Sequence, residues 1–301
     1  MTMGVSRSAE PGSSQTSRVQ RRLSWAWVGV IPFFVVATAF MLLPILFLVV
    51  GSFQDSHGHL TLQNYVDLTQ PLPVLAYTNS IEISLVTAIG GGIFGFLLAY
   101  ALILGGLPAF LRNAAMTFAG VASNFAGIPL ALAFIFTYGQ LGLVTGLLRT
   151  VLHIDLYAGG FSLYTTVGVE LVYMYFQFPL MMLIVAPALD GLRPEWREAS
   201  ENLGASPAQY WRYVALPILT PTLLGTMILL FGNAFGAQAT AYELTGGILN
   251  LVSVLIGAEI SGDVLHNVGL GYAMAVGMIV IMGVAIAMYT LLQRRSERWL
   301  R

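Results

Sequence analysis

Residues 198–217 read EASENLGASPAQYWRYVALP, a polar stretch in a chain of 301 residues that is 57% hydrophobic and only 9% charged. The charged side chains in and just before this stretch are Asp190, Arg193, Glu195, Arg197, Glu198, Glu201 and Arg212. Because charge is scarce elsewhere, the cluster marks a segment that meets water, whereas the sequence on either side of it is apolar.

Composition predicts a membrane protein. Soluble domains are about 45–50% apolar and about 25% charged, whereas this chain has a mean hydropathy of +0.78. The net charge of -1 argues against nucleic acid as a partner, since binding a polyanion needs a basic surface. Without cysteines, the chain forms no disulfide, zinc-thiolate site or thiol nucleophile.

Six apolar stretches are long enough to cross a hydrocarbon core, which takes about 20 helical residues. They cover residues 28–53, 81–104, 115–138, 165–189, 218–241 and 270–292. The first is too long for the apolar part of a signal peptide and lacks a small-residue cleavage site, so we expect an uncleaved anchor. The sequence therefore predicts an all-α polytopic membrane protein with six transmembrane helices.

Arginine placement predicts the orientation, because basic residues are retained on the cytoplasmic side. Twelve arginines fall on one side of the predicted spans: Arg7, Arg18, Arg21, Arg22, Arg112, Arg193, Arg197, Arg212, Arg294, Arg295, Arg298 and Arg301. Only Arg149 falls on the other side. Both termini and the loop that holds residues 190–217 are therefore expected in the cytoplasm.

The chemistry of this loop predicts a helix, a turn and a second helix. Pro194 suits the first turn of a helix, and Gly204 suits the left-handed position just past a helix end. Ser206 and Gln209 have the spacing of a capping box, with Pro207 at the first helical position between them. We therefore expect one helix over residues 194–203 and another from residue 207 towards residue 217.

The first of these helices has an apolar side and a polar side. Its apolar residues are Trp196, Ala199 and Leu203, and its polar residues are Glu195, Glu198 and Asn202. Helices that lie on lipid headgroups usually present basic residues, so the glutamates favour docking to a protein partner. Packing on lipid remains the alternative.

The loop resembles a motif of the membrane permease subunits of ABC importers, E-A-A-x3-G-x9-I-x-L-P. The matching residues are Glu198, Ala199, Ser200, Gly204, Val214, Leu216 and Pro217, with Ser200 in place of alanine and Val214 in place of isoleucine. The resemblance implies a cytoplasmic arm over residues 1–27, a first transmembrane helix and outer loop over 28–75, a permease core over 76–293 and a tail over 294–301. The coupling loop covers residues 190–217.

The resemblance also implies partners. Permeases of this kind pair with a second permease, identical or different, and with two cytoplasmic ATPase subunits, and they receive a small polar substrate from an extracytoplasmic solute-binding protein. The six residues expected to couple the ATPase to the surrounding membrane spans are Glu198, Ala199, Ser200, Gly204, Leu216 and Pro217. No cofactor is implied, and the protein is expected in the bacterial inner membrane, surrounded by lipid.

No motif points to an enzyme. A nucleotide-binding P-loop needs a lysine, and the chain has none, so ATP hydrolysis is expected on the partner subunits. Gly90–Gly95 formally fits G-x-G-x-x-G, but it lies inside an apolar span, where Gly91 and Gly95 favour close helix packing. The four histidines, which fall in predicted outer loops, are His57, His59, His153 and His266; a solvated loop is favoured over a metal site there.

Polar side chains within spans tend to face a cavity or another helix. The four expected to line the translocation pathway are Glu170, Gln177, Asn233 and Gln238. The alternative for each is a hydrogen bond between helices that fixes packing. Glu170 also leaves open another class of function, an ion-coupled secondary transporter in which it is the coupling carboxylate; a scaffolding role is a third.

The last outer loop bears on the substrate. Its apolar run, residues 248–260, is too short to span and predicts a re-entrant or surface-lying helix. The loop residues Thr245, Gly246, Gly247, Ile256 and Gly257 resemble those of importers for spermidine and putrescine, ferric iron and aminophosphonates. The resemblance implies a polyamine or a similar small polar solute.

Overall fold

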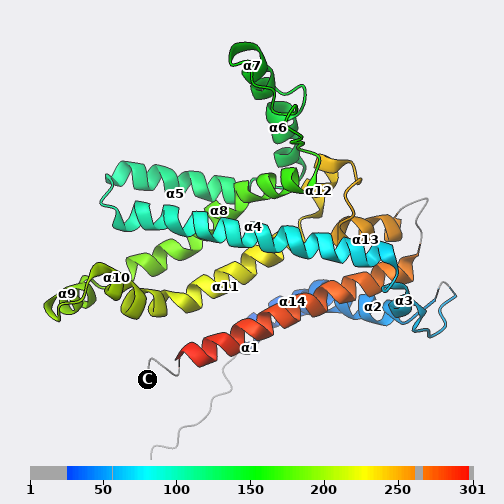
Figure 1. The fold of residues 1–301 in the computed structure, drawn as a ribbon. Coiled ribbons are helices and arrows are strands. Elements are labelled where there is room, and N and C mark those ends of the chain that lie inside the picture. Colours follow the sequence, from blue (N-terminus) through cyan, green and yellow to red (C-terminus); the bar gives the residue numbers. More distant parts are fainter. Residues whose placement is uncertain (1–25, 56, 262–266, 298–301) are drawn as a thin grey trace, which may run out of the picture. The chain divides into compact units, whose positions relative to one another are not determined.

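The computed structural model describes residues 26–55, 57–261 and 267–297, and the regular elements in these ranges are helices (Figure 1). This confirms the predicted all-α class. The chain divides into two compact units, Met1–Phe47 and Leu48–Arg301. Arg7, Arg18, Arg21, Arg22, Asp263, His266, Arg298 and Arg301 lie outside the described residues.

The described part of the first unit is an apolar helix. It comprises α1 (Ala26–Ala37), a turn of π-helix (Thr38–Leu42) and the start of α2 (Leu43–Ser52). The apolar stretch Gly29–Ser52 is long enough to span a membrane and agrees with the predicted first span. Its side chains are exposed, for example 68% for Phe33 and 77% for Phe40, so they are available to lipid or to another protein.

The second unit contains the remaining described helices. They are α3 (Gln63–Asp67), α4 (Pro71–Leu104), α5 (Ala109–Asn124), α6 (Ile128–Tyr138), α7 (Leu143–Val151), α8 (Thr166–Asp190), α9 (Pro194–Asn202), α10 (Pro207–Tyr210), the π turn η2 (Trp211–Ala215), α11 (Leu216–Phe235), α12 (Gln238–Thr245), α13 (Val252–Ser261) and α14 (Val268–Glu297). Six helical stretches among the described residues of the whole chain are long and apolar enough to span a membrane, which agrees with the predicted number. The third of them, Ile128–Val151, begins later in the chain than the predicted stretch over residues 115–138.

Two predicted spans are interrupted. The third, predicted as one helix over residues 115–138, breaks between α5 and α6, where Gly127 has φ of +74°. The fifth, predicted over residues 218–241, breaks after Phe235. The N–H of Gly127 donates to Thr240 Oγ1 of α12 at 2.8 Å. Hydropathy averages over such breaks, because a freed backbone group that finds a side-chain partner does not require a polar sequence.

Close packing of α4 against α8 and α11 forms the centre of the second unit (Figure 1). A Cβ on Gly91 would lie 2.6 Å from Gln177 Cβ, and a Cβ on Gly95 would lie 2.4 Å from the carbonyl oxygen of Phe178. A Cβ on Gly92 would lie 2.2 Å from Met227 Sδ of α11. The predicted packing role of Gly91 and Gly95 is confirmed, since only glycine allows the backbones to approach this closely.

The predicted short helix of the last outer loop is α13. It is apolar and has 10 residues, so it is too short to span a membrane. Val252 and Leu255 are buried against the rest of the unit, and the backbone N–H of Val252 donates to Ser80 Oγ of α4 at 2.8 Å. This segment is therefore packed into the fold on one side and held to the outer half of α4.

Candidate functional site

The first helix of the predicted coupling loop is α9, and it ends as predicted. Gly204 has φ of +80°. Its N–H donates to the carbonyl of Glu201 at 2.9 Å, and the N–H of Ala205 donates to the carbonyl of Ser200 at 3.0 Å. These two bonds form a Schellman motif, which gives the last carbonyls of the helix hydrogen-bond partners and fixes the direction of the chain beyond it.

The second helix begins with the predicted capping box. Ser206 Oγ accepts a hydrogen bond from the N–H of Gln209 at 3.3 Å, and Gln209 Oε1 accepts one from the N–H of Ser206 at 2.7 Å. Pro207 occupies the first helical position. The backbone groups left unpaired at the end of α9 and at the start of the next helix therefore find hydrogen-bond partners within the turn itself.

Pro217 does not end the second helix. The helical stretch runs from Pro207 to Phe235 through α10, η2 and α11. Proline cannot donate to the carbonyl four residues earlier, and its ring clashes with that carbonyl. In η2 the N–H of Leu216 donates instead to Trp211, five residues back. The π turn adapts the backbone just before Pro217, so the loop is joined to the membrane span by continuous helix.

The predicted apolar side of α9 is uncovered. Leu203 is 88% exposed and Trp196 is 36% exposed, and Ala199 beside them is exposed as well. The acidic residues Glu195 and Glu198 are also exposed. The second unit thus presents an apolar and acidic helix face that none of its own described helices covers.

The root of the loop is buried. Tyr210, Ala215 and Leu219 pack into a cluster with Leu189 of α8 and with side chains of α4. At the same end of the bundle Arg112 forms an ion pair with Asp190, at the end of α8. The root is therefore held rigidly, whereas α9 beyond it is free to meet another protein.

Ser200, where the family motif has alanine, leaves the helix undisturbed. Its hydroxyl donates to the carbonyl of Arg197 at 2.8 Å, inside α9. Arg197 Nε donates to Glu201 Oε1 at 2.8 Å, and this hydrogen bond raises the pKa of the Arg197 guanidinium above its ordinary value. Both polar groups are thus satisfied within the helix.

The structure separates the four predicted pathway residues. Gln177 is fully buried, and its Nε2 donates to the carbonyl of Leu230 in α11 at 2.8 Å. Its amide therefore joins α8 to α11, which is the alternative stated above. Glu170 is half-buried in α8, which packs against α4, the helix that carries Glu82. The sequence did not predict that the helices of Glu82 and Glu170 pack together, because the two residues belong to different spans and residue spacing is informative only within one helix.

Asn233 and Gln238 lie on exposed positions near the break between α11 and α12. Gln238 reaches α13, where a Cβ on Gly257 would lie 2.4 Å from Gln238 Nε2. No hydrogen bond or ion pair among the described residues joins any two of the four predicted pathway side chains. The pathway role of Glu170, Gln177, Asn233 and Gln238 therefore remains a proposal.

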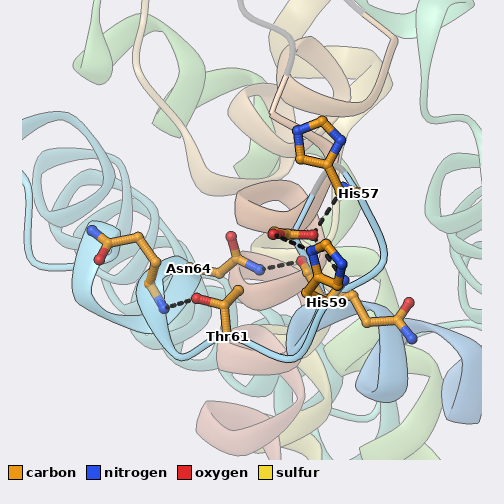
Figure 2. A network of polar contacts seen from close by, with 7 residues as sticks. His57, His59, Thr61 and Asn64 are labelled. Carbon is orange, nitrogen blue, oxygen red and sulfur yellow. Dashed lines mark hydrogen bonds and ion pairs between the residues drawn. The ribbon is translucent and has the colours of Figure 1, made fainter.

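His57 and His59, two of the four histidines in the predicted outer loops, belong to a turn rather than to a ligand cluster. Asp55 Oδ1 accepts hydrogen bonds from the N–H of His57 at 2.8 Å and of His59 at 2.9 Å (Figure 2). The bond from His59 is the main reason that the pKa of Asp55 lies below its ordinary value. Within the described ranges, no three potential metal-ligating side chains come together.

Comparison with known proteins decides the family. The family model of the binding-protein-dependent transport system inner membrane component matches residues 12–298. The chain belongs to this family. It is therefore a multi-pass inner-membrane permease subunit of an ABC importer, a transport subunit and not an enzyme. This membership leaves no ground for the ion-coupled transporter or the scaffold.

The relatives of this permease include sulfate systems. A probable sulfate transport system permease protein of Nephroselmis olivacea is 28% identical over 80% of each chain. The sulfate transport system permease of Escherichia coli K12 is 29% identical over 69% of this chain and 70% of its own. The structure of a bacterial alginate ABC transporter matches 90% of this chain and 95% of its own, with a TM-score of 0.70 and 17% identity, which supports the fold alone.

Proposed function

We propose that α9 and the turn at Gly204 form the surface on which a cytoplasmic ATPase subunit docks, and that closure of the ATPase moves the spans through this loop. The observation that carries the proposal is the exposed apolar and acidic side of α9, above all Leu203 at 88% exposure. A large apolar side chain left this open at the edge of a well-packed root is a feature of interaction sites.

The route of transmission is rigid on both sides of the turn. The Schellman motif fixes the angle at which α9 leaves Gly204, and the capping box fixes the start of the next helix. From Pro207 the helix runs unbroken to Phe235 across the membrane. A displacement of α9 is therefore transmitted to α11 without an intervening flexible segment. The buried contacts of Tyr210 and Leu219 transmit the same displacement to α8 and α4.

The full importer follows from the same proposal. It contains two ATPase subunits, this permease, a second permease that is identical or different, and an extracytoplasmic solute-binding protein. Support comes from the name of the family, whose members depend on a binding protein, and from the exposed apolar surface of α1, which needs lipid or a second protein around it.

The substrate proposed first is a small oxyanion of the sulfate type, because several relatives are named as permeases of sulfate systems. A polyamine or similar small cation is the second candidate. The feature that favours it is a pair of carboxylates, Glu82 on α4 and Glu170 on α8, which lie in the halves expected to face outward of two helices that pack against each other.

Cross-linking tests the docking surface directly, because the chain has no cysteine of its own. A single cysteine replaces Leu203, and membranes that contain the whole importer are treated with a short thiol-to-amine cross-linker. We expect the permease to be joined to an ATP-hydrolysing subunit. A single cysteine at Phe118, 55% exposed on α5, is the matched control and is expected to give no such product. Equal cross-linking of both variants, or none at Leu203, contradicts the proposal.

A further inference from the structure

A cavity of about 260 Å³ lies behind α9. One wall is the last turn of α4, with Tyr100 and Leu104, and another is the first turns of the helix from Pro207, with Tyr210 and Trp211. The third wall is α9 itself. The volume of the cavity is below the ~300 Å³ at which typical small-molecule pockets begin. The cavity therefore suits one compact polar group rather than a whole organic ligand.

The cavity lies at the boundary of the membrane. Leu104 is the last residue of one membrane-spanning stretch, and Pro207 is the first residue of another. The rings of Tyr100 and Trp211 pack edge to face there, with centroids 5.2 Å apart. Tyrosine and tryptophan are enriched at the level of lipid headgroups, and arginine placement puts this end of the bundle on the cytoplasmic side.

The wall formed by α9 is its basic side. Arg193, Arg197 and Glu201 recur every fourth residue and line the cavity together, whereas Trp196 and Leu203 are not among its lining residues. Arg197 is paired with Glu201. Among the described residues Arg193 has no carboxylate partner, and its guanidinium packs 5.8 Å from the centre of the Trp196 ring. The wall therefore carries one positive charge that the fold leaves unbalanced.

Two phenols add further donors. Tyr100 and Tyr210 both line the cavity. No described protein group hydrogen-bonds either phenolic hydroxyl, so both hydroxyls are available as donors. The side chain of Arg193, the two phenols and the N–H groups of Arg197 that Glu201 does not engage supply donors around one small space, and such donors suit the oxygen atoms of a phosphate group.

The geometry points to the phosphate of an anionic phospholipid from the cytoplasmic leaflet as the occupant of this cavity. Basic pockets beside membrane helices on that side bind such headgroups. Inorganic phosphate has the same charged oxygens but no apolar part, whereas Leu104 and Trp211 offer apolar surface next to the cavity. The bound headgroup would bridge α4, α9 and the helix from Pro207, and so hold the docking helix at a set angle to the membrane.

Native mass spectrometry of the purified full-length chain tests this inference. The protein is titrated with phosphatidylglycerol or with phosphatidylcholine of the same acyl chains. We expect phosphatidylglycerol to bind more tightly, and Arg193→Gln to weaken it about fivefold, the effect of one basic residue near a lipid surface. Arg193 is chosen because its charge forms no ion pair within the described fold, so its loss does not break α9.

Arg212→Gln is the matched control. Arg212 lies in the same loop, is exposed, and packs 5.6 Å from the ring of Tyr213, but it does not line the cavity. We expect this variant to bind phosphatidylglycerol like the unaltered chain. Equal loss in both variants overturns the site, because it would show only a general effect of charge, and so does retention in Arg193→Gln.

A competition experiment separates the two sources of phosphate. Inorganic phosphate is added in large molar excess to the chain loaded with phosphatidylglycerol. Retention of the lipid supports a lipid headgroup as the ligand. Displacement of the lipid by phosphate, with phosphate bound in an Arg193-dependent way, overturns the lipid and leaves the free anion as the occupant.

Discussion

The N–H of Ala205 donates a hydrogen bond to the carbonyl of Ser200 across the turn at Gly204. This bond closes the end of α9 and sets the direction in which the chain leaves it. A Cβ on Gly204 would meet no atom within 4 Å, so the constraint at this position is the left-handed backbone conformation and not a lack of room for a side chain.

Loss of the capping box should loosen the second arm of the loop. Ser206→Ala removes the acceptor for the N–H of Gln209, and loss of such a cap costs about 1 kcal/mol. We expect faster amide hydrogen exchange over residues 208–212. Ser123→Ala is the control, because the Ser123 hydroxyl caps no helix start: it donates to the carbonyl of Gly120 at 3.3 Å and accepts from Asn124 Nδ2 at 3.4 Å. Unchanged exchange in Ser206→Ala would argue against the cap.

Close packing at Gly91 should make this position intolerant of a side chain. Gly91→Ala places a Cβ 2.6 Å from Gln177 Cβ and 3.2 Å from its carbonyl carbon, and overpacking of this kind costs about 1–3 kcal/mol. Thermal unfolding in detergent measures the loss. Gly120→Ala, where no atom lies within 4 Å of the added Cβ, should leave stability unchanged or slightly higher. Equal stability of the two variants would contradict the packing.

The outer turn should depend on the charge of Asp55. Its folded pKa is lowered, chiefly by the hydrogen bond from His59. The ionised carboxylate therefore stabilises the turn above the unfolded pKa of about 3.9, and the stabilisation is lost as the pH falls through the lower folded value. The amide shifts of His57 and His59 should titrate together below that pH, and Asp55→Asn should abolish the step. A midpoint above about 3.9 would contradict the assignment.

Charge in the outer halves of α4 and α8 should distinguish the two proposed substrates. If the substrate is a cation, Glu170→Gln and Glu82→Gln should each lower its uptake, about fivefold for one nearby charge. If it is a sulfate-type oxyanion, the same changes should leave uptake unchanged or raise it. Uptake into proteoliposomes with saturating binding protein measures this. A fall in sulfate uptake in both variants would contradict the idea that the carboxylates of Glu82 and Glu170 act on the substrate only through their charge.

Much of the coupling loop could be predicted because its chemistry is local. Pro194, Gly204 and the capping box act within a few residues of themselves, so sequence spacing determines the two helix ends. The basic side of α9 was open to the same reasoning, since Arg193, Arg197 and Glu201 repeat every fourth residue. The cavity that this side of α9 faces could not be predicted in this way, because its other walls come from α4 and from the helix that begins at Pro207.

The structure of the membrane spans, in contrast, depends on contacts between residues far apart in the sequence. Hydropathy located them, but the break at Gly127 depends on a hydrogen bond to Thr240, more than a hundred residues away. The burial of Gln177 depends likewise on Gly91 and Leu230 from two other helices. A polar residue in an apolar span has the same sequence signature whether it faces a cavity or bonds to another helix, so the pathway could not be separated from the packing.

The central claim is that the turn at Gly204 transmits the movement of the ATPase. Gly204→Val and Gly204→Asn test it, because a β-branched residue resists the left-handed conformation, at about 1–2 kcal/mol, whereas asparagine adopts it readily. The measurement is ATP-driven uptake beside ATP hydrolysis, in proteoliposomes that contain the whole importer. The account predicts that Gly204→Val loses most uptake per ATP hydrolysed and that Gly204→Asn retains it. Equal uptake per ATP in both variants and in the unaltered protein would contradict it.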